Sequence, residues 1–349
     1  MGKIQDKDGL YLFLRPYVDW LFRRSYRSFR YIGKENIPAD GAVIYAPNHA
    51  NALCDAMCVL GIDRQQKVFV ARADIFRDPK KAKILNWLKI MPISRVRDGL
   101  EEVRHNDETI NKAVETLQDG VPFCILPEGT HRPKHSLLPL SKGIFRIALQ
   151  ANERFGEQKP IYIVPVGIEY GDYFHLWDSV TVTIGKPINV TEFVKGERGK
   201  VKGEREEVKS ERGKVKSERE EVKSESYPQI MMALREELTL RMRELILWVP
   251  DDEHYEENIA KILPKKKRLP RWLAYPLAVL LFPLFVVSAL MTIPLWAMWL
   301  FIRHKVQDPA FHNSVQFVWQ LVFMTITLLI PLPFWMFVQE YLYQVKSEK

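Results

Sequence analysis

The sequence predicts an α/β fold, with a mostly parallel sheet flanked by helices, followed by a C-terminal two-helix transmembrane hairpin. Short apolar runs alternate with helical patterns between residues 42 and 184, and this alternation is typical of a parallel sheet. Two longer runs without a charged residue follow, at 272–302 and 314–338. A membrane-spanning helix needs about 20 apolar residues, and both runs exceed that length.

The N-terminal region, residues 1–32, mixes apolar and aromatic side chains with five arginines. The arginines are Arg15, Arg23, Arg24, Arg27 and Arg30. An amphipathic helix on a membrane surface has this pattern, because arginines reach the headgroups while apolar side chains enter the lipid. A helix that docks its apolar face on a protein core has the same pattern, and both alternatives are open. We expect a membrane-surface region here.

Residues 33–195 contain the predicted sheet. Four apolar runs have the length and composition of buried strands, at 42–46, 68–70, 123–126 and 161–164. Sites in parallel sheets gather at the carboxyl ends of the strands. Polar residues that directly follow these runs are therefore the first candidates for a functional site.

Two helices are predicted between these strands from the spacing of their apolar residues. The first has Ile110, Ala113, Val114 and Leu117 on one face, and Gly120 can end it. Ser141 can cap the second, which has Ile144, Ile147, Ala148 and Ala151 on its inner face.

Residues 196–226 form a charged tract with a seven-residue repeat. Four units follow one another from 196 to 223, and each has a single apolar residue, a valine. A coiled-coil seam needs two apolar positions per heptad, so we expect a solvated charged helix or a disordered segment. We interpret the tract as a tandem expansion on the surface, with partner binding as the alternative. Residues 227–264 then continue as a more ordinary helical part of the soluble region, with Met231, Leu234, Leu238, Met242 and Leu245 on one stripe.

Residues 265–349 contain the predicted hairpin. The first run includes three prolines, so we expect a kinked or tilted helix. Five basic residues precede it between 265 and 271, whereas the loop between the runs has only Arg303 and Lys305. By the positive-inside rule, the sequence predicts a multi-pass membrane protein with two spans and a cytoplasmic catalytic domain. A pair of buried core helices is the alternative.

The composition narrows the possible partners. A formal net charge of +8 over 349 residues suits nucleic acid, an anionic membrane or phosphorylated substrates. The apolar C-terminal third favours membrane lipids, and we expect no nucleic-acid partner. The three cysteines, Cys54, Cys58 and Cys124, form no disulfide framework, which fits a reducing compartment.

His49 and Asp55 are the first candidates for chemistry. A neutral imidazole can take a proton from an alcohol, and it needs a second group to hold its tautomer. Positions six residues apart on one regular helix face different directions. We therefore expect His49 in the loop before a helix and Asp55 on its first or second turn. Taken alone, the pair could equally be a solvent-facing cap.

A second polar string follows the run at 123–126. Pro127 sets a turn there, and Gly129 lets the backbone approach a ligand closely. Glu128 and Thr130 can form hydrogen bonds with polyol hydroxyls. Positive charge for a phosphate comes from His131, Arg132, Lys134 and His135. In a third segment, Arg95 and Arg97 can bind phosphate through two hydrogen bonds each.

Four blocks in this order resemble the glycerolipid acyltransferase family, the lysophosphatidate acyltransferase-like proteins. The blocks are His49 with Asp55, Pro92 with Arg95, Pro127 to Thr130, and Val164 to Val166. The resemblance covers about residues 28 to 190 and implies that 33–195 is an acyltransferase domain. It implies that His49 is the general base on the acceptor hydroxyl and that Asp55 orients it.

The resemblance also implies the remaining roles. Arg95, Glu128 and Gly129 would hold the glycerol phosphate, and Pro165 would shape the wall of the pocket. Arg97 is a rival to Arg95, and Arg132 can take over a phosphate contact that the family makes with a different residue. The acyl donor would be a thioester on coenzyme A or acyl carrier protein. Neither a covalent acyl-enzyme, a metal nor a further cofactor is implied.

The spacing of the first block bears on the acceptor. The family most often has four residues between His and Asp, and this chain has five. A branch resembling the fungal glycerol-3-phosphate/dihydroxyacetone-phosphate acyltransferases has the longer spacing and C-terminal membrane spans. We therefore expect acylation of glycerol 3-phosphate in phospholipid biosynthesis, with lysophosphatidate as the alternative acceptor.

Two functions from other classes compete with this one. His49, Cys54, Asp55 and Cys58 could be ligands of a hydrolytic metal, although the cysteine spacing is that of buried helix residues. The chain could also be a membrane scaffold with a decayed site and the repeat tract as its binding element. Because all four blocks are present, we favour the enzyme.

Overall fold

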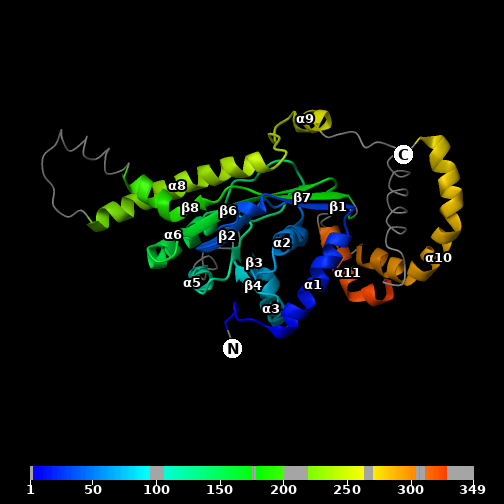
Figure 1. Cartoon of the computed structure of the whole chain (residues 1–349), viewed down its shortest axis with the longest axis horizontal. Helices are drawn as coiled ribbons and strands as arrows, with labels where there is room; N and C mark the ends of the chain where they lie inside the picture. Colours follow the sequence, from blue (N-terminus) through cyan, green and yellow to red (C-terminus); the bar gives the residue numbers. More distant parts are fainter. Residues whose placement is uncertain are drawn as a thin grey trace.

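The computed structural model describes residues 3–94, 106–174, 176, 178–199, 219–262, 270–303, 306 and 311–327 (Figure 1). Four of the predicted features lie wholly or partly outside these ranges. They are Arg95, Arg97, residues 200–218 of the charged tract, and residues 328–338 of the second predicted span.

Eight strands in the described part of the chain form one sheet, in the order β1-β7-β6-β2-β5-β3-β4 with β8 beside β6. The strands are β1 (Ser28–Ile32), β2 (Ala42–Pro47), β3 (Val68–Arg72), β4 (Ile90–Ile93), β5 (Phe123–Cys124), β6 (Ile161–Tyr170), β7 (Ser179–Ile184) and β8 (Ile188–Asn189). The central strands β6, β2, β5, β3 and β4 pair in parallel. Only β7 and β8 run antiparallel to β6 among the described pairs. The predicted fold class, an α/β fold with a mostly parallel sheet, is confirmed.

All four predicted strands are present, as β2, β3, β5 and β6. The structure adds β1, β4, β7 and β8, which the sequence analysis missed. In β7 every second residue is buried, the pattern of a half-exposed strand that alternation could have revealed.

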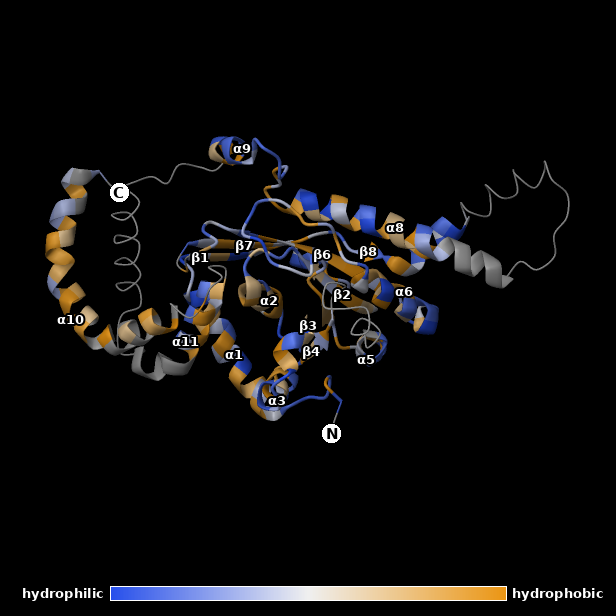
Figure 2. Ribbon diagram, turned by 180° about the vertical axis from the view of Figure 1, so that it is seen from behind, coloured by the Kyte–Doolittle hydropathy of each residue, from blue (hydrophilic) through white to orange (hydrophobic). Residues whose placement is uncertain are grey.

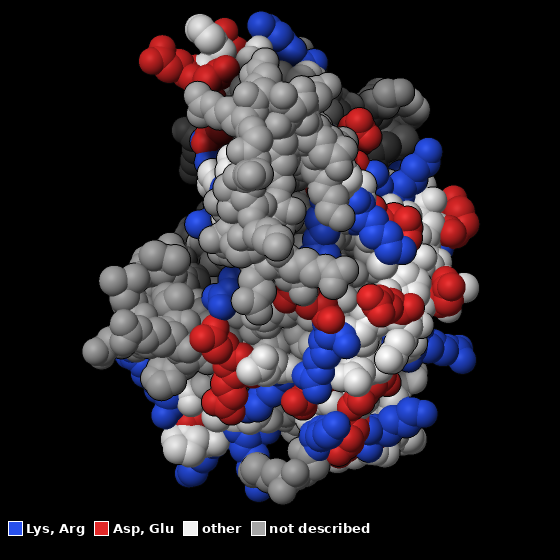
Figure 3. Space-filling view, turned by 90° about the vertical axis from the view of Figure 1, so that its left-hand side faces the viewer, with Lys and Arg blue, Asp and Glu red and all other residues white. Residues whose placement is uncertain are grey.

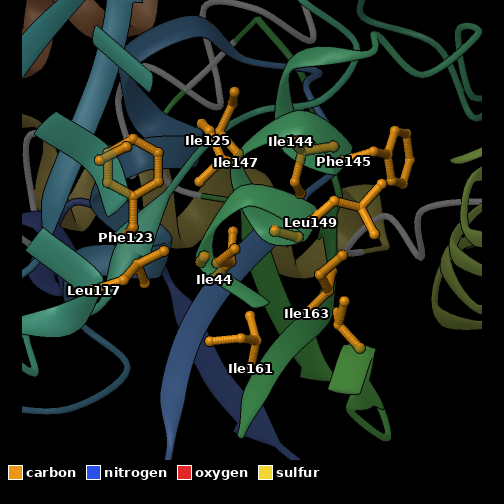
Figure 4. Close-up of a cluster of buried hydrophobic side chains, with 14 of the residues drawn as sticks. Ile44, Leu117, Phe123, Ile125, Ile144, Phe145, Ile147, Leu149, Ile161 and Ile163 are labelled. Atoms are coloured by element: carbon orange, nitrogen blue, oxygen red, sulfur yellow. The ribbon is translucent and has the colours of Figure 1, made fainter. Parts of the chain in front are cut away.

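Helices cover both faces of the sheet (Figures 1 and 2). One face packs against α5 (Asn106–Gln118), α6 (Gly143–Phe155) and α8 (Arg219–Leu245). The other packs against α1 (Gly9–Arg24), α2 (Ala52–Leu60) and α11 (Phe311–Thr327). Successive residues of β2 divide between the two cores, with Ile44 in the first and Tyr45 in the second, both almost fully buried. Figure 4 shows the first core, where aliphatic side chains of α6 lie over Ile44.

The remaining elements are shorter or lie outside these layers. They are η1 (Lys34–Asn36), η2 (Ala73–Phe76), α3 (Pro79–Trp87), α9 (Tyr255–Ile262) and α10 (Arg271–Arg303). Lys and Arg side chains are mixed with Asp and Glu over the face of the molecule that Figure 3 shows, so the basic charge does not gather there.

The start of α6 corrects one prediction. Ser141 does not cap this helix, because the N-cap residue is Lys142 and no side chain accepts a capping hydrogen bond there. Instead, the Ser141 N–H donates to the carbonyl of Pro127 at 2.7 Å and ties the helix start to the polar turn. The predicted inner face of α6 is confirmed, since its four residues are fully buried. The predicted face of α5 is confirmed as well.

Helix α8 begins at Arg219, inside the predicted charged tract. Its buried stripe consists of Ile230, Leu234, Leu238 and Met242, at every fourth position. The predicted stripe had Met231 in place of Ile230, a shift of one residue at its start. Packing against the sheet core therefore begins where the apolar spacing starts, several residues after the helix itself begins.

Helices α10 and α11 occupy the region of the predicted hairpin. No helix in the ranges that the structure describes is long and apolar enough to cross a membrane. The two-span hairpin is therefore unsupported. Helix α11 shows why its residues do not form a lipid-facing span. It buries Asn313, Ser314 and Phe317 against the protein. Helix α11 therefore packs on the core, as one helix of the alternative pair would.

Two arginines of helix α1, one buried and one exposed, donate hydrogen bonds to backbone carbonyls. Arg15 is buried and donates to four carbonyl oxygens at the end of α2 and in the loop after it, at 2.6 to 2.8 Å. Arg23 donates to the carbonyl of Gly61 at 2.6 Å. These cations therefore satisfy the last carbonyls of α2, where the helix dipole is negative. Leu10, Phe13 and Trp20 remain exposed on the same helix.

Replacing Arg15 should weaken the fold. We expect Arg15→Ala to lower the free energy of unfolding by about 2–4 kcal/mol, because buried carbonyls would lose charge-assisted hydrogen bonds. Urea denaturation followed by circular dichroism measures this change. Arg24→Ala, an exposed arginine on the same helix, should change it by less than about 0.5 kcal/mol. Equal effects of the two substitutions would contradict the assigned role of Arg15.

Candidate active site

His49 and Asp55 meet at the carboxyl end of β2. The chain leaves the sheet after Pro47, passes His49 in the loop, and enters α2 with Asn51 as the N-cap residue and Asp55 in the first turn. His49 Nδ1 lies 2.8 Å from Asp55 Oδ2. The predicted geometry, with a loop histidine and a helical aspartate, is confirmed. The Asp55 side chain is completely buried, whereas that of His49 is 16% exposed.

Asp55 has two further hydrogen-bond donors. The Asn51 N–H donates to Oδ2 at 2.8 Å, and the Tyr170 hydroxyl donates to Oδ1 at 2.7 Å. These two donors and the His49 ring together fix the orientation of the Asp55 carboxylate. Tyr170 was not predicted as a site residue. It is the last residue of β6, four residues after the block Val164 to Val166. Its place at the end of a predicted strand is the signal that could have indicated it.

The five-residue segment between His49 and Asp55 has an uncommon backbone conformation at the start of α2. Ala52 has a φ of +42°, a backbone conformation that is uncommon for residues other than glycine. The Asn51 side-chain amide donates to the carbonyl of Tyr173 at 3.0 Å. Asn48 exchanges two hydrogen bonds with the backbone of Ile168. The loop is thereby held against β6 on both sides of His49.

Glu128 supports the backbone of His49. Its Oε1 accepts from the His49 N–H at 2.7 Å, and its Oε2 accepts from the Leu138 N–H at 2.9 Å. The Arg132 N–H donates to the His49 carbonyl at 3.0 Å. The backbone N–H and carbonyl of His49 are therefore both hydrogen-bonded to residues of this turn. Glu128 is buried, and its two oxygens serve the backbone. Its predicted hydrogen bond with a polyol stays a prediction.

The rest of the turn lies close by. Gly129 has a φ of +68°, and a Cβ at this position would meet no atom within 4 Å. This open, left-handed position is compatible with the predicted close approach of a ligand to the backbone. Thr130, the next residue, is half-buried.

Burial raises the pKa of Glu128 to about 7, with the two N–H donors acting in the opposite direction. Because this value lies above the usual 4.5, Glu128 stabilises the fold fully below pH 4.5 and loses that contribution as the pH rises through about 7. We expect Glu128→Gln to destabilise the protein less at pH 8 than at pH 5, by about 2.5 kcal/mol. Urea denaturation at the two pH values measures this. Glu157→Gln, an exposed control, should show no such difference; a pH-independent effect of Glu128→Gln would contradict the assignment.

Three of the predicted phosphate-binding side chains, Arg132, Lys134 and His135, have acidic partners within the chain. Arg132 forms an ion pair with Asp251 and donates to Ser136 Oγ at 2.7 Å. Lys134 forms an ion pair with the same Asp251 at 2.7 Å. His135 Nδ1 lies 3.2 Å from a carboxylate oxygen of Glu169. A substrate phosphate at Arg132 would therefore compete with Asp251, a residue that is distant in the sequence.

Pro165 and the three cysteines are buried in the protein. Pro165 is buried within β6 beside Ala46 of β2, and its carbonyl accepts from the Gly185 N–H at 2.9 Å. Cys54 and Cys58 are fully buried in α2, and burial raises the pKa of Cys54 to about 12. In the part of the chain that the structure describes, no group of three or more His, Cys, Asp or Glu side chains could hold a metal ion.

These features define a class of protein: an α/β domain with a hydrogen-bonded histidine–aspartate pair at the carboxyl edge of its sheet. Residues 28–169 match the family model described as Acyltransferase. Together with the four motif blocks, this match and the relatives described next support the assignment of this region to the glycerolipid acyltransferase family.

Two curated relatives match about half of this chain. One is the 1-acyl-sn-glycerol-3-phosphate acyltransferase BAT2, chloroplastic, of Brassica napus, 28% identical over 163 residues; the match covers 45% of this chain and 44% of the relative. The other is the 1-acyl-sn-glycerol-3-phosphate acyltransferase of Bacillus subtilis (strain 168), 22% identical over 160 residues, covering 46% and 73%. The matched region thus spans less than half the length of the Brassica relative.

A remote likeness exists to a solved structure, the crystal structure of the 1-acyl-sn-glycerophosphate (LPA) acyltransferase PlsC from Thermotoga maritima. The sequence identity is 19% and the TM-score is 0.40. The likeness covers 68% of this chain and 84% of that one.

Proposed function

We propose that this protein transfers a fatty acyl group from an acyl thioester, on coenzyme A or acyl carrier protein, to the free hydroxyl of glycerol 3-phosphate. The observation that carries the proposal is the His49–Asp55 hydrogen bond of 2.8 Å with part of the imidazole exposed. An ionised carboxylate can only accept, so Nδ1 carries the proton and Nε2 has the free electron pair. This tautomer is the one that a general base requires.

The proposed reaction needs only these two side chains to move a proton. Nε2 of His49 takes the proton of the acceptor hydroxyl as its oxygen attacks the thioester carbonyl carbon. The tetrahedral intermediate then expels the thiolate, the carbon–sulfur bond breaks, and the imidazolium returns the proton to sulfur. Asp55 stays ionised and stabilises the imidazolium. The products are the ester and the free thiol.

Two observations support different acceptors. The five-residue spacing between His49 and Asp55 is the feature that resembles the glycerol 3-phosphate branch. The names of the two curated relatives support the second candidate acceptor, 1-acyl-sn-glycerol 3-phosphate. With this acceptor, the protein would be a lysophosphatidate acyltransferase that produces phosphatidate.

An acceptor panel tests this proposal. The purified full-length chain is given glycerol 3-phosphate, dihydroxyacetone phosphate or lysophosphatidate, each with acyl-CoA and with acylated acyl carrier protein. Transfer to glycerol 3-phosphate at the highest kcat/KM supports the first candidate, and preference for lysophosphatidate supports the second. Absence of transfer with every pair would refute both.

We also propose that the protein works at a membrane. Apolar side chains that are more than half exposed support this: Leu10 and Phe13 on α1, and Trp272, Tyr275, Val279 and Leu280 on α10. Flotation with phosphatidylglycerol vesicles tests it, and protein that stays at the bottom of the gradient would contradict it. The predicted cytoplasmic location of the catalytic domain stays a prediction.

A further inference from the structure

The beginning of α11 is built into the surroundings of the His49–Asp55 pair, although it lies far along the chain. Ser314 Oγ accepts from the Leu53 N–H at 3.2 Å, at the first turn of the helix that carries Asp55. The Asn313 amide donates to the carbonyl of Tyr173 at 2.9 Å, the same oxygen that accepts from Asn51. Asn313 is completely buried. These contacts fix the position of α11 relative to the loop of His49.

A row of aromatic rings leads from the base to this helix. The His49 and His131 rings meet edge to face, with centroids 5.6 Å apart. His131 meets Phe311, the first residue of α11, in the same way at 4.8 Å. Phe311 is 36% exposed. Its ring contacts His131, which in turn contacts the ring of His49, the proposed base.

The two proposed substrates would need different contacts from the side chains at the start of α11. The acceptor is small and phosphorylated, and the turn after His131 carries two described cations, Arg132 and Lys134. The donor brings a long apolar chain that begins at the very carbon that is attacked. An exposed phenylalanine suits the chain and offers nothing to a phosphate.

The same face of α11 continues beyond Phe311. Val315 and Val318 follow at helical spacing, half-buried and 44% exposed respectively. Phe311 and Val318 are seven positions apart, which is about 10 Å along a helix axis and roughly the length of eight methylene groups. The face is therefore long enough to line a medium-length chain.

We propose that Phe311 is a specificity-determining residue, and that the acyl chain of the donor packs along the α11 face formed by Phe311, Val315 and Val318. This inference rests on the proposed acyl transfer. It assigns the C-terminal helix a part in a site whose reacting groups all come from the N-terminal half of the chain.

Substitutions of Phe311 with a panel of acyl-CoA donors of 8 to 18 carbons test the proposal. The quantity measured is the ratio of kcat/KM between long and short chains. We expect Phe311→Trp to lower this ratio at least tenfold by narrowing the space beside His131, and Phe311→Ala to raise it. Met232→Ala removes an exposed apolar side chain on α8, on the opposite face of the sheet, and should leave the ratio unchanged.

An equal loss for all chain lengths would show that Phe311 only supports the fold, and an unchanged ratio in both variants would also overturn the proposal. Binding of unreactive thioether analogues of acyl-CoA gives an independent measurement, in which Phe311→Trp should weaken binding of long analogues at least fivefold. A wild-type protein that transfers no acyl group would refute the proposed function. Chain-length-independent analogue binding would then refute this inference separately.

Discussion

His49→Ala should lower kcat/KM for acyl transfer by about 10³-fold, within the range of 10² to 10⁴ for a positioned general base. The substitution removes the group that takes the acceptor's proton, and in the described surroundings the only direct partner of Asp55 that can act as a base at neutral pH is this imidazole. Initial rates at saturating donor and varied acceptor measure the effect.

The fold should survive this substitution, which makes the result interpretable. The His49 N–H keeps its hydrogen bond to the Glu128 carboxylate, and the His49 carbonyl keeps its bond from the Arg132 N–H. Both bonds use backbone groups of residue 49, which the substitution does not change. Thermal unfolding should shift by only a few degrees. A folded His49→Ala protein that transfers acyl groups at nearly the wild-type rate would exclude His49 as the base.

Asp55→Asn should have an effect of similar size, about 10³- to 10⁴-fold on kcat, for a different reason. Three donors converge on Asp55: His49 Nδ1–H, the Asn51 N–H and the Tyr170 hydroxyl. An amide has one acceptor oxygen, and its NH₂ group would face a donor. The imidazole would then adopt the other tautomer, with the proton on Nε2, where it cannot accept one from the substrate.

Two comparisons separate this effect from unfolding. Asp55→Asn should also lower the free energy of unfolding by about 1–3 kcal/mol, because it leaves a buried donor unsatisfied. Tyr170→Phe removes one donor and keeps the carboxylate, so its loss of rate should be at least tenfold smaller than that of Asp55→Asn. If both variants lost rate equally while remaining folded, Asp55 would have no special part in holding the tautomer.

The fold was largely predictable because its signals are local. Apolar runs of strand length marked β2, β3, β5 and β6, and the helical spacing from Ile110 to Leu117 marked α5. The cap of α6 was not predictable from Ser141, since this residue donates its N–H to the Pro127 carbonyl, a contact made across a loop. Likewise, the pattern of arginines in α1 did not reveal that Arg15 is buried against the end of α2.

The candidate site was predictable in its reacting groups and not in their surroundings. His49 and Asp55 are close in the sequence, so loop and helix geometry sufficed to bring them together. Tyr170 and Asp251 come from segments more than a hundred residues away from the groups that they contact. The charges of Arg132 and Lys134 could be counted from the sequence, whereas their pairing with Asp251 depends on where the chain after α8 lies.

The sequence by itself determined the α/β class, the strand ends where polar groups gather, and the pairing of His49 with Asp55, because each depends on residues near one another along the chain. Only the tertiary structure decided that Glu128 supports the His49 backbone, that Tyr170 completes the shell of Asp55, and that α11 packs beside the active site. The physical reason is the same in each case. Hydrogen bonds and ring contacts between distant segments exist only after the sheet and its helices have brought those segments together.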